Sequence, residues 1–229
     1  MKSYAIPVPQ TPAVPVADSE HRFPVRRIHC VGRNYAEHAR EMGKDPTREA
    51  PFFFQKPADA IVADHEDVPY PPLTQNFHHE IELVVAIGRE GANIDAARAL
   101  EHVFGYSVGN DLTRRDLQLA ARDKGRPWEP GKAFDHSAAI GAIRTVARVG
   151  HVSSGRIWLR VNGQPRQQAD VRDLIWDVPE IISILSTYVR LVPGDLIYTG
   201  TPAGVGALQR GDLVEGGIDG LGTLTNRIV

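Results

Sequence analysis

Hydrophobic and polar residues alternate along several short stretches of the chain, and a period of two predicts β-strands. The clearest stretch is residues 79–88, which has one apolar face: Ile81, Leu83, Val85 and Ile87. Similar runs predict strands at 27–32, 51–57, 105–111, 195–198 and within 211–229. Residues 156–168 predict a hairpin, because Asn162-Gly163 suits a type I′ turn.

Apolar residues spaced three or four apart predict helices at 34–43, 94–104, 112–125 and 178–192, the last of which is followed by Pro193-Gly194. Asn34 is the expected N-cap of the first helix, with Gly43 as its stop signal. Pro179 lies near the start of the last and longest helix, as a helix N-terminus allows. The strands do not alternate regularly with the helices, so the predicted fold class is α+β with mixed β-sheets.

The composition, 42% hydrophobic and 24% charged residues in a chain of 229, is ordinary for a globular protein. A formal net charge of −2 argues against a nucleic-acid-binding protein, which usually carries a basic surface. No apolar run approaches the roughly 18 residues that span a membrane. Cys30 is the single cysteine, so no internal disulfide forms and we expect a cytoplasmic protein with neither membrane nor nucleic-acid partners.

The N-terminal 27 residues differ from the rest of the chain. They are rich in proline and lack an apolar signal core, so residues 1–27 are expected to form an extended arm. Residues 28–229 contain no repeat and no low-complexity tract, and they are numerous enough for one core. We therefore expect a single folded domain after the arm.

Two glutamates interrupt the predicted strand at 79–88. Glu80 and Glu82 share one face, so their carboxylates point the same way. Two like charges at the edge of a core repel each other and resist the loss of water, and a divalent cation would remove both problems. The alternative is a solvated edge strand with a polar outer face.

A third carboxylate strengthens the metal interpretation. Asp111 follows the apolar stretch 105–111 directly, although a helix N-cap is its alternative role. Three carboxylates form an all-oxygen site that suits Mg²⁺ or Mn²⁺ better than zinc. His78 shares the face of the glutamates, so a mixed histidine and glutamate zinc site is a second alternative.

Several motifs resemble those of one known family. They are "CVGRNYAEHAREMG", "HHEIELVVAIG", "GYSVGNDLTRRDLQ", "GKAFDHSAAIGA", "VNGQPRQQ" and "GDLIYTGTPAGVG". In this order and over residues 28–229, they resemble the blocks of the fumarylacetoacetate hydrolase family. The resemblance implies a roll of mixed β-sheets with peripheral helices, a homodimer, and hydrolysis of a carbon–carbon bond in a 2,4-dioxo acid such as fumarylpyruvate.

The resemblance also assigns roles to particular residues. The Mg²⁺ or Mn²⁺ ligands of the family fall on Glu80, Glu82 and Asp111. Its catalytic pair, carried on a short lid helix, falls on His38 and Glu41. Lys132 matches a lysine placed to stabilise a substrate oxyanion. The positions that match substrate-binding residues are Arg115, Gln118, Thr201 and Lys56.

The spacing of the pair is chemically sensible. Residues three apart share a helix face, so Glu41 can orient the ring of His38 while that ring takes a proton from water. The alternative is a solvated surface pair. The same stretch carries Arg40, Lys44 and Arg48, and we expect one of these cations to contact the second carboxylate of fumarylpyruvate.

Other functions fit the sequence less well. "GYSVG" fits the G-x-S-x-G pattern of serine hydrolases around Ser107, but no histidine follows His151 and no HGGG-type loop is present. A non-catalytic protein would leave the three carboxylates and the pair without a reason. Decarboxylation or isomerisation of oxaloacetate or a related 2-oxo diacid is the alternative reaction on the same fold.

Overall fold

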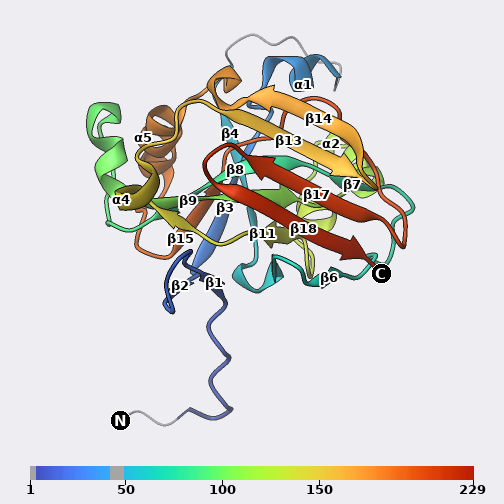
Figure 1. The fold of residues 1–229 in the computed structure, drawn as a ribbon, viewed down its shortest axis with the longest axis horizontal. Helices are drawn as coiled ribbons and strands as arrows, with labels where there is room; N and C mark the ends of the chain where they lie inside the picture. Colours follow the sequence, from blue (N-terminus) through green and yellow to red (C-terminus); the bar gives the residue numbers. More distant parts are fainter. Residues whose placement is uncertain (1–3, 42–48) are drawn as a thin grey trace.

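The structure is a computed structural model that describes residues 4–41 and 49–229, and its strands dominate the fold (Figure 1). The largest sheet has eight strands, in the order β4 (Phe52–Lys56), β3 (Arg27–Gly32), β15 (Asp195–Tyr198), β8 (Ile81–Ile87), β9 (Val103–Asp111), β11 (Ala138–Ile140) and β5 (Ile61–Ala63), with β12 (Arg144–Thr145) also on β9. A five-stranded sheet packs against it: β14 (Gln164–Asp170), β13 (Arg156–Val161), β17 (Leu213–Ile218), β18 (Gly222–Ile228) and β6 (Asp67–Val68).

Smaller elements complete the fold around these two sheets. A third sheet contains β10 (Thr113–Arg114), β7 (Phe77–His79) and β16 (Gly206–Ala207), and a hairpin pairs β1 (Ala13–Pro15) with β2 (Arg22–Pro24). The α-helices are α1 (Ala36–Glu41), α2 (Arg115–Asp123), α3 (Glu129–Lys132), α4 (Val146–Val149) and α5 (Val178–Tyr188). Short 3₁₀ helices are η1 (Ala58–Ala60), η2 (Ala96–His102) and η3 (Val171–Asp173). Mixed sheets with peripheral helices confirm the predicted α+β class.

Strand β8 is buried on both faces, because each face packs against a separate part of the core. Its odd-numbered residues join the main core between the two large sheets and α5. Val84 and Ala86 belong to a second core that includes the N-terminal hairpin. Glu82 shares the face of Val84 at the end of the strand, where the apolar core gives way to the polar site described below.

Most predicted elements are present, with local differences. Asn162 and Gly163 have φ angles of 52° and 76°, so the predicted left-handed turn between β13 and β14 is confirmed. The helix expected at 94–104 is the 3₁₀ helix η2. The helix expected to end just before Pro193 ends earlier, at Tyr188, and Leu191 beyond it pairs with Gly91 as an isolated bridge.

The predicted N-cap at Asn34 is wrong. Its side-chain amide donates to the carbonyls of Trp176 and Thr199, and its side-chain oxygen accepts from the Trp176 N–H. A side chain that binds two distant segments, at Trp176 and Thr199, cannot also satisfy the first turn of α1. The stop signal Gly43 lies outside the described residues.

The N-terminal arm is extended only in its first part. Residues 4–12 run away from the body of the molecule (Figure 1), and Tyr4, Ile6 and Val8 are exposed. The hairpin that follows is anchored, because Val14 and Phe23 are buried in the second core. Within the described residues, no helix combines the length and the apolar character that a membrane crossing requires.

Candidate metal-dependent active site

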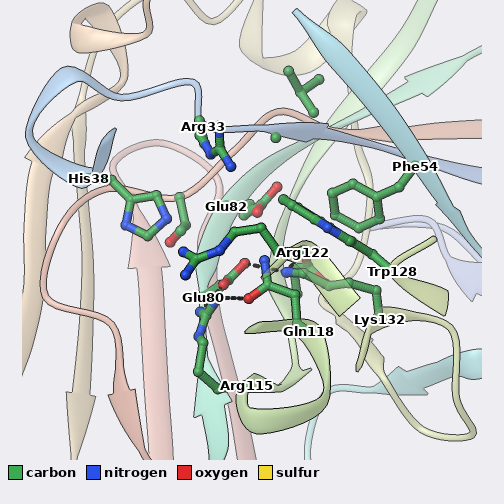
Figure 2. Close-up of a pocket in the computed structure, with 14 residues that line it drawn as sticks. Arg33, His38, Phe54, Glu80, Glu82, Arg115, Gln118, Arg122, Trp128 and Lys132 are labelled. Carbon is green, nitrogen blue, oxygen red and sulfur yellow. Dashed lines mark hydrogen bonds and ion pairs between the residues drawn. The ribbon is translucent and has the colours of Figure 1, made fainter. Parts of the chain in front are cut away.

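A cavity opens at the ends of β3, β8 and β9 and is lined by residues from distant parts of the chain (Figure 2). Helix α1 supplies His38, helix α2 supplies Arg115 and Gln118, and the loop after β15 supplies Thr201. Lys132 comes from α3. The structure therefore brings together the predicted metal ligands, the predicted catalytic histidine and most of the predicted substrate-binding residues.

Three buried carboxylates form the bottom of this cavity. One oxygen from each of Glu80, Glu82 and Asp111 lies within 4.8 Å of the others. The β8–β9 register sets this arrangement, since the Asp111 N–H donates to the Glu80 carbonyl at 2.8 Å. The predicted cluster exists, whereas the alternative of a solvated edge strand is wrong because all three side chains are buried.

Three cations hold two of these carboxylates, Glu80 and Asp111, in place. The Lys132 ammonium donates to Glu80 Oε2 at 2.7 Å, to Asp111 Oδ2 at 2.6 Å and to the Thr113 hydroxyl at 2.7 Å. Arg115 forms a buried ion pair with Glu80. Lys56 Nζ lies 2.8 Å from Asp111 Oδ1. We call the six residues of this cluster the floor: Lys56, Glu80, Glu82, Asp111, Arg115 and Lys132.

The carboxylates of the floor are not equally compensated. Burial alone would raise the pKa of Glu80, but the charges of Lys132 and Arg115 outweigh it and hold that pKa below its usual range. Burial, together with Asp111 and Glu80, raises the pKa of Glu82 well above its usual range. Glu82 accepts one hydrogen bond, from the Gly200 N–H at 2.7 Å. Its carboxylate is thus the least compensated of the three.

The donor set fits a hard divalent cation. Asp111 Oδ1 is buried and lacks a hydrogen bond, because its 2.8 Å ion pair with Lys56 does not have hydrogen-bond geometry. This oxygen and an under-compensated Glu82 carboxylate leave room for a ligand with positive charge. Carboxylate oxygens are the ligands that Mg²⁺ and Mn²⁺ favour. The residues present therefore fit the metal that the sequence predicted.

A histidine and a glutamate face the floor from α1. His38 Nδ1 lies 3.1 Å from Glu41 Oε2, and both carboxylate oxygens of Glu41 accept from the Gly204 N–H at 3.2 Å. The hydrogen bond with His38 is the main reason why the pKa of Glu41 is lowered, so this side chain remains a carboxylate. A carboxylate acceptor assigns the imidazole proton to Nδ1 and leaves Nε2 free to accept another proton.

The cavity wall presents neutral hydrogen-bond donors beside the carboxylates. Gln118 Oε1 accepts from Arg115 at 2.8 Å, which leaves its amide N–H groups available. The Thr201 hydroxyl accepts from Gln167 Nε2 at 2.8 Å and so keeps its own proton to donate. Gln167 is itself held by His79 at 2.9 Å. This buried glutamine was missed, because only the fold brings "RQQ" next to "TGTP".

Lys56 occupies a different place from the one expected for a substrate-binding residue. Its side chain is fully buried behind Asp111, and Nζ also donates to the carbonyls of Leu112 at 3.0 Å and Lys132 at 2.5 Å. It is not among the residues that line the cavity. Its contacts are those of a residue that positions Asp111 and Lys132.

The contacts of His78, Asp111 and Ser107 exclude the alternative roles that the sequence offered for them. His78 bonds to the Asn76 side chain at 2.7 Å and is not part of the carboxylate cluster. Asp111 is not a helix N-cap, since α2 begins at Arg115. The Ser107 hydroxyl is buried and donates to the Gly141 carbonyl at 2.7 Å, so it cannot serve as a nucleophile.

Comparisons with known proteins agree with this geometry. A family model described as fumarylacetoacetate (FAA) hydrolase C-terminal matches residues 27–229. The chain is 48% identical over 181 residues to a fumarylpyruvate hydrolase of Ralstonia sp, covering 79% of this chain and 94% of that protein. It is 41% identical over 196 residues to the mitochondrial oxaloacetate tautomerase of Rattus norvegicus, covering 86% and 88%. The crystal structure of fumarylpyruvate hydrolase from Pseudomonas aeruginosa in complex with Mn²⁺ and pyruvate aligns with 53% identity and a TM-score of 0.97, covering 99% of each chain.

Proposed function

The chain belongs to the fumarylacetoacetate hydrolase family, and from this premise we propose that it hydrolyses a 2,4-dioxo acid, with fumarylpyruvate as substrate and fumarate and pyruvate as products. The observation that carries the proposal is the buried cluster of Glu80, Glu82 and Asp111 facing the His38–Glu41 pair. A similar protein whose crystal structure contains Mn²⁺ and pyruvate supports it.

Glu80, Glu82 and Asp111 would hold the metal, Mg²⁺ or Mn²⁺. When bound, the metal supplies positive charge that polarises substrate oxygens and stabilises the negative charge that develops on the pyruvyl half. The protein contributes the fixed position of the three carboxylates. Lys132 and Lys56 hold Asp111 from two sides, so the ligand set is organised by the fold.

The proton transfer falls to His38. Its free Nε2 takes a proton from water, while Glu41 holds Nδ1 and stabilises the positive charge that the ring gains. The water oxygen bonds to the acyl carbonyl carbon, and the bond from this carbon to the neighbouring methylene breaks. The electron pair of that bond leaves with the pyruvate half as an enolate, which is protonated at carbon to give pyruvate. The acyl half leaves as a carboxylate.

Other residues position the substrate and stabilise its charge. Thr201 and Gln118 have donors free for the oxygens at the pyruvyl end. Lys132 already donates to three oxygens. We therefore propose that Lys132 stabilises the developing oxyanion through its positive charge and not through a direct hydrogen bond.

A second candidate is the tautomerisation or decarboxylation of oxaloacetate. It is favoured by the 41% identity to an oxaloacetate tautomerase. This substrate would present the same 2-oxo carboxylate to the floor, but its reactions require no attack by water. His38 would then move a proton at carbon, or would not take part.

A product assay decides between these functions. The purified protein with Mg²⁺ or Mn²⁺ is given fumarylpyruvate, acetylpyruvate and oxaloacetate in parallel. We expect pyruvate and fumarate from fumarylpyruvate at the highest kcat/KM. Turnover of oxaloacetate alone would overturn the proposal in favour of the second candidate.

The family resemblance also supports three proposals about the organisation of the protein. We propose that residues 28–229 form the catalytic domain, that two chains form a homodimer, and that the protein acts in the cytoplasm. Sedimentation of the purified protein tests the dimer, since a monomer would contradict it. Removal of residues 1–12 tests whether the first part of the arm is dispensable, and an active, folded product is expected because residues 4–12 contribute no core residue.

A further inference from the structure

The floor accounts for only one of the two carboxylates of a dicarboxylate substrate. In the proposed reaction, the pyruvyl end of fumarylpyruvate meets the metal ligands, Gln118 and Thr201. The second carboxylate lies at the other end of the molecule, and it needs a cation to replace the water that it loses on binding.

Two further arginines line this cavity without belonging to the floor. Arg33 follows β3 and Arg122 lies in the last turn of α2, and both line the cavity that contains His38 and Glu82 (Figure 2). Among the described residues, Arg33 has no salt bridge. Arg122 pairs with its neighbour Asp123 at 2.9 Å, but that side chain is 63% exposed and such surface pairs are weak.

An aromatic wall connects the floor to Arg33. Lys132 Nζ lies 5.1 Å from the centroid of the Phe54 ring, and Phe54 lies 5.9 Å from Trp128. The Arg33 guanidinium lies 5.9 Å from the Trp128 ring and 5.3 Å from the Phe52 ring. A flat conjugated chain that starts at the floor would therefore run along aromatic faces and end beside Arg33.

The cations expected from the sequence are less suited to this role. Arg40 forms an ion pair with Glu37, is 54% exposed and does not line the cavity. Lys44 and Arg48 lie outside the described residues. Of these three cations, Arg40 is turned to solvent, whereas Arg33 and Arg122 line the cavity.

We propose that Arg33 and Arg122 form the binding site for the distal carboxylate of a planar, unsaturated dicarboxylic acyl group. We call Arg33, Arg122 and Trp128 the mouth. This inference rests on the proposed function and adds the residues that select the acyl group. Two guanidinium groups at one cavity wall repel each other, and the positive charge of Arg122 contributes, after burial, to a lowered pKa of Arg33. A carboxylate that binds at both would relieve this repulsion, and each guanidinium can donate two hydrogen bonds.

Paired substrates test the proposal. Arg33→Gln and Arg122→Gln are compared with wild type on fumarylpyruvate and acetylpyruvate, which share the pyruvyl end but not the distal carboxylate. The ratio of the two kcat/KM values should fall about 10- to 150-fold, the range for a hydrogen bond to a charged group. Arg126→Gln is the matched control, because it removes an exposed arginine just after α2 and should keep the wild-type ratio. Arg122→Lys should restore part of the preference.

The outcomes have distinct meanings. Equal losses on both substrates would overturn the proposal and show that the arginines serve the pyruvyl end or the fold. An unchanged ratio in both variants would also overturn it. Circular dichroism and thermal unfolding confirm that each variant is folded before it is compared.

A binding measurement keeps the inference separate from the proposed reaction. Calorimetry on the Mn²⁺-loaded protein compares 2-oxoheptanedioate with 2-oxoheptanoate, which both have the seven-carbon chain of fumarylpyruvate but differ in the distal carboxylate. Wild type should bind the dicarboxylate at least about tenfold more tightly, and either arginine variant should lose that preference. If wild type fails to hydrolyse fumarylpyruvate but shows this preference, the proposed function fails and the subsite stands. If wild type shows no preference, the subsite fails whatever the reaction.

Discussion

The floor and the mouth of the same cavity differ in burial and in charge. In the floor, three carboxylates and three cations are buried, and their positions follow from strand register and multiple contacts. In the mouth, Arg33 and Arg122 are partly exposed and lie on the segments that follow β3 and end α2. The floor has an under-compensated carboxylate at Glu82 and an Asp111 Oδ1 that lacks a hydrogen bond, and both features suit a cation. The mouth has excess positive charge and so calls for an anion.

This difference suggests that the floor carries out the reaction and that the mouth selects the substrate. Three cations facing three carboxyl groups, with the pKa of Glu82 raised, keep the buried cluster tolerable before a metal binds. A divalent cation then gives the floor a surplus of positive charge, which matches the anionic pyruvyl end common to all acylpyruvates. The acyl group extends beyond the floor. Selectivity between substrates should therefore depend on the mouth, and the variants below test this division.

The largest effect is expected in the floor at Glu82. Glu82→Gln removes a metal ligand while keeping the shape of the side chain. Activity should fall about a thousandfold or more, because the charge supplied by the metal is worth several kcal/mol. The metal-free protein should unfold at the same temperature as wild type or higher, since Glu82 has the least compensated carboxylate. Mn²⁺ titration by calorimetry measures the metal affinity of the variant, and thermal unfolding measures the stability of its metal-free form. Unchanged Mn²⁺ affinity would disprove the three-carboxylate site.

The next largest effect is expected at the histidine that faces the floor. His38→Gln should lower the hydrolysis of fumarylpyruvate about 10²- to 10⁴-fold, the range for a lost general base. Mn²⁺ affinity should change little, because His38 is not one of the three clustered carboxylates. Steady-state kinetics on fumarylpyruvate and oxaloacetate provide the comparison. Equal losses on both substrates would argue that His38 positions the substrate and does not activate water.

The two regions also differ in how far the sequence could predict them. Strand alternation placed Glu80 and Glu82 on one face, and Asp111 stood out as a carboxylate directly after an apolar strand. The three cations of the floor were assigned by the family resemblance alone. The mouth requires Arg33 and Arg122 to meet at one cavity, and no period or spacing in the sequence encodes a contact between segments so far apart. Asn34 failed as a predicted cap for the same reason: distant carbonyls, including that of Thr199, bind its side chain.

A third effect should appear in stability and not only in activity. Lys56→Met removes a fully buried cation of the floor and leaves Asp111 less compensated, which should lower the free energy of unfolding of the metal-free protein by about 3–5 kcal/mol. Saturating Mn²⁺ should recover part of this loss, because the metal restores positive charge beside Asp111. Urea unfolding with and without Mn²⁺ measures it, with Lys124→Met as the exposed control. A loss that Mn²⁺ does not reduce would mean that Lys56 supports packing alone.

The smallest effect on stability is expected in the mouth. The double variant Arg33→Gln, Arg122→Gln should change the free energy of unfolding by about 0.5 kcal/mol or less, as most partly exposed substitutions do. The loss of the Arg33 contacts with Phe52 and Trp128, about 0.5–1 kcal/mol, is opposed by relief of the repulsion between the guanidinium groups. Urea unfolding of the metal-free protein measures this change, and the Lys56→Met variant is measured in the same experiment for comparison. A loss above about 2 kcal/mol would mean that the arginines hold the fold together, and the contrast between a structural floor and a selective mouth would then fail.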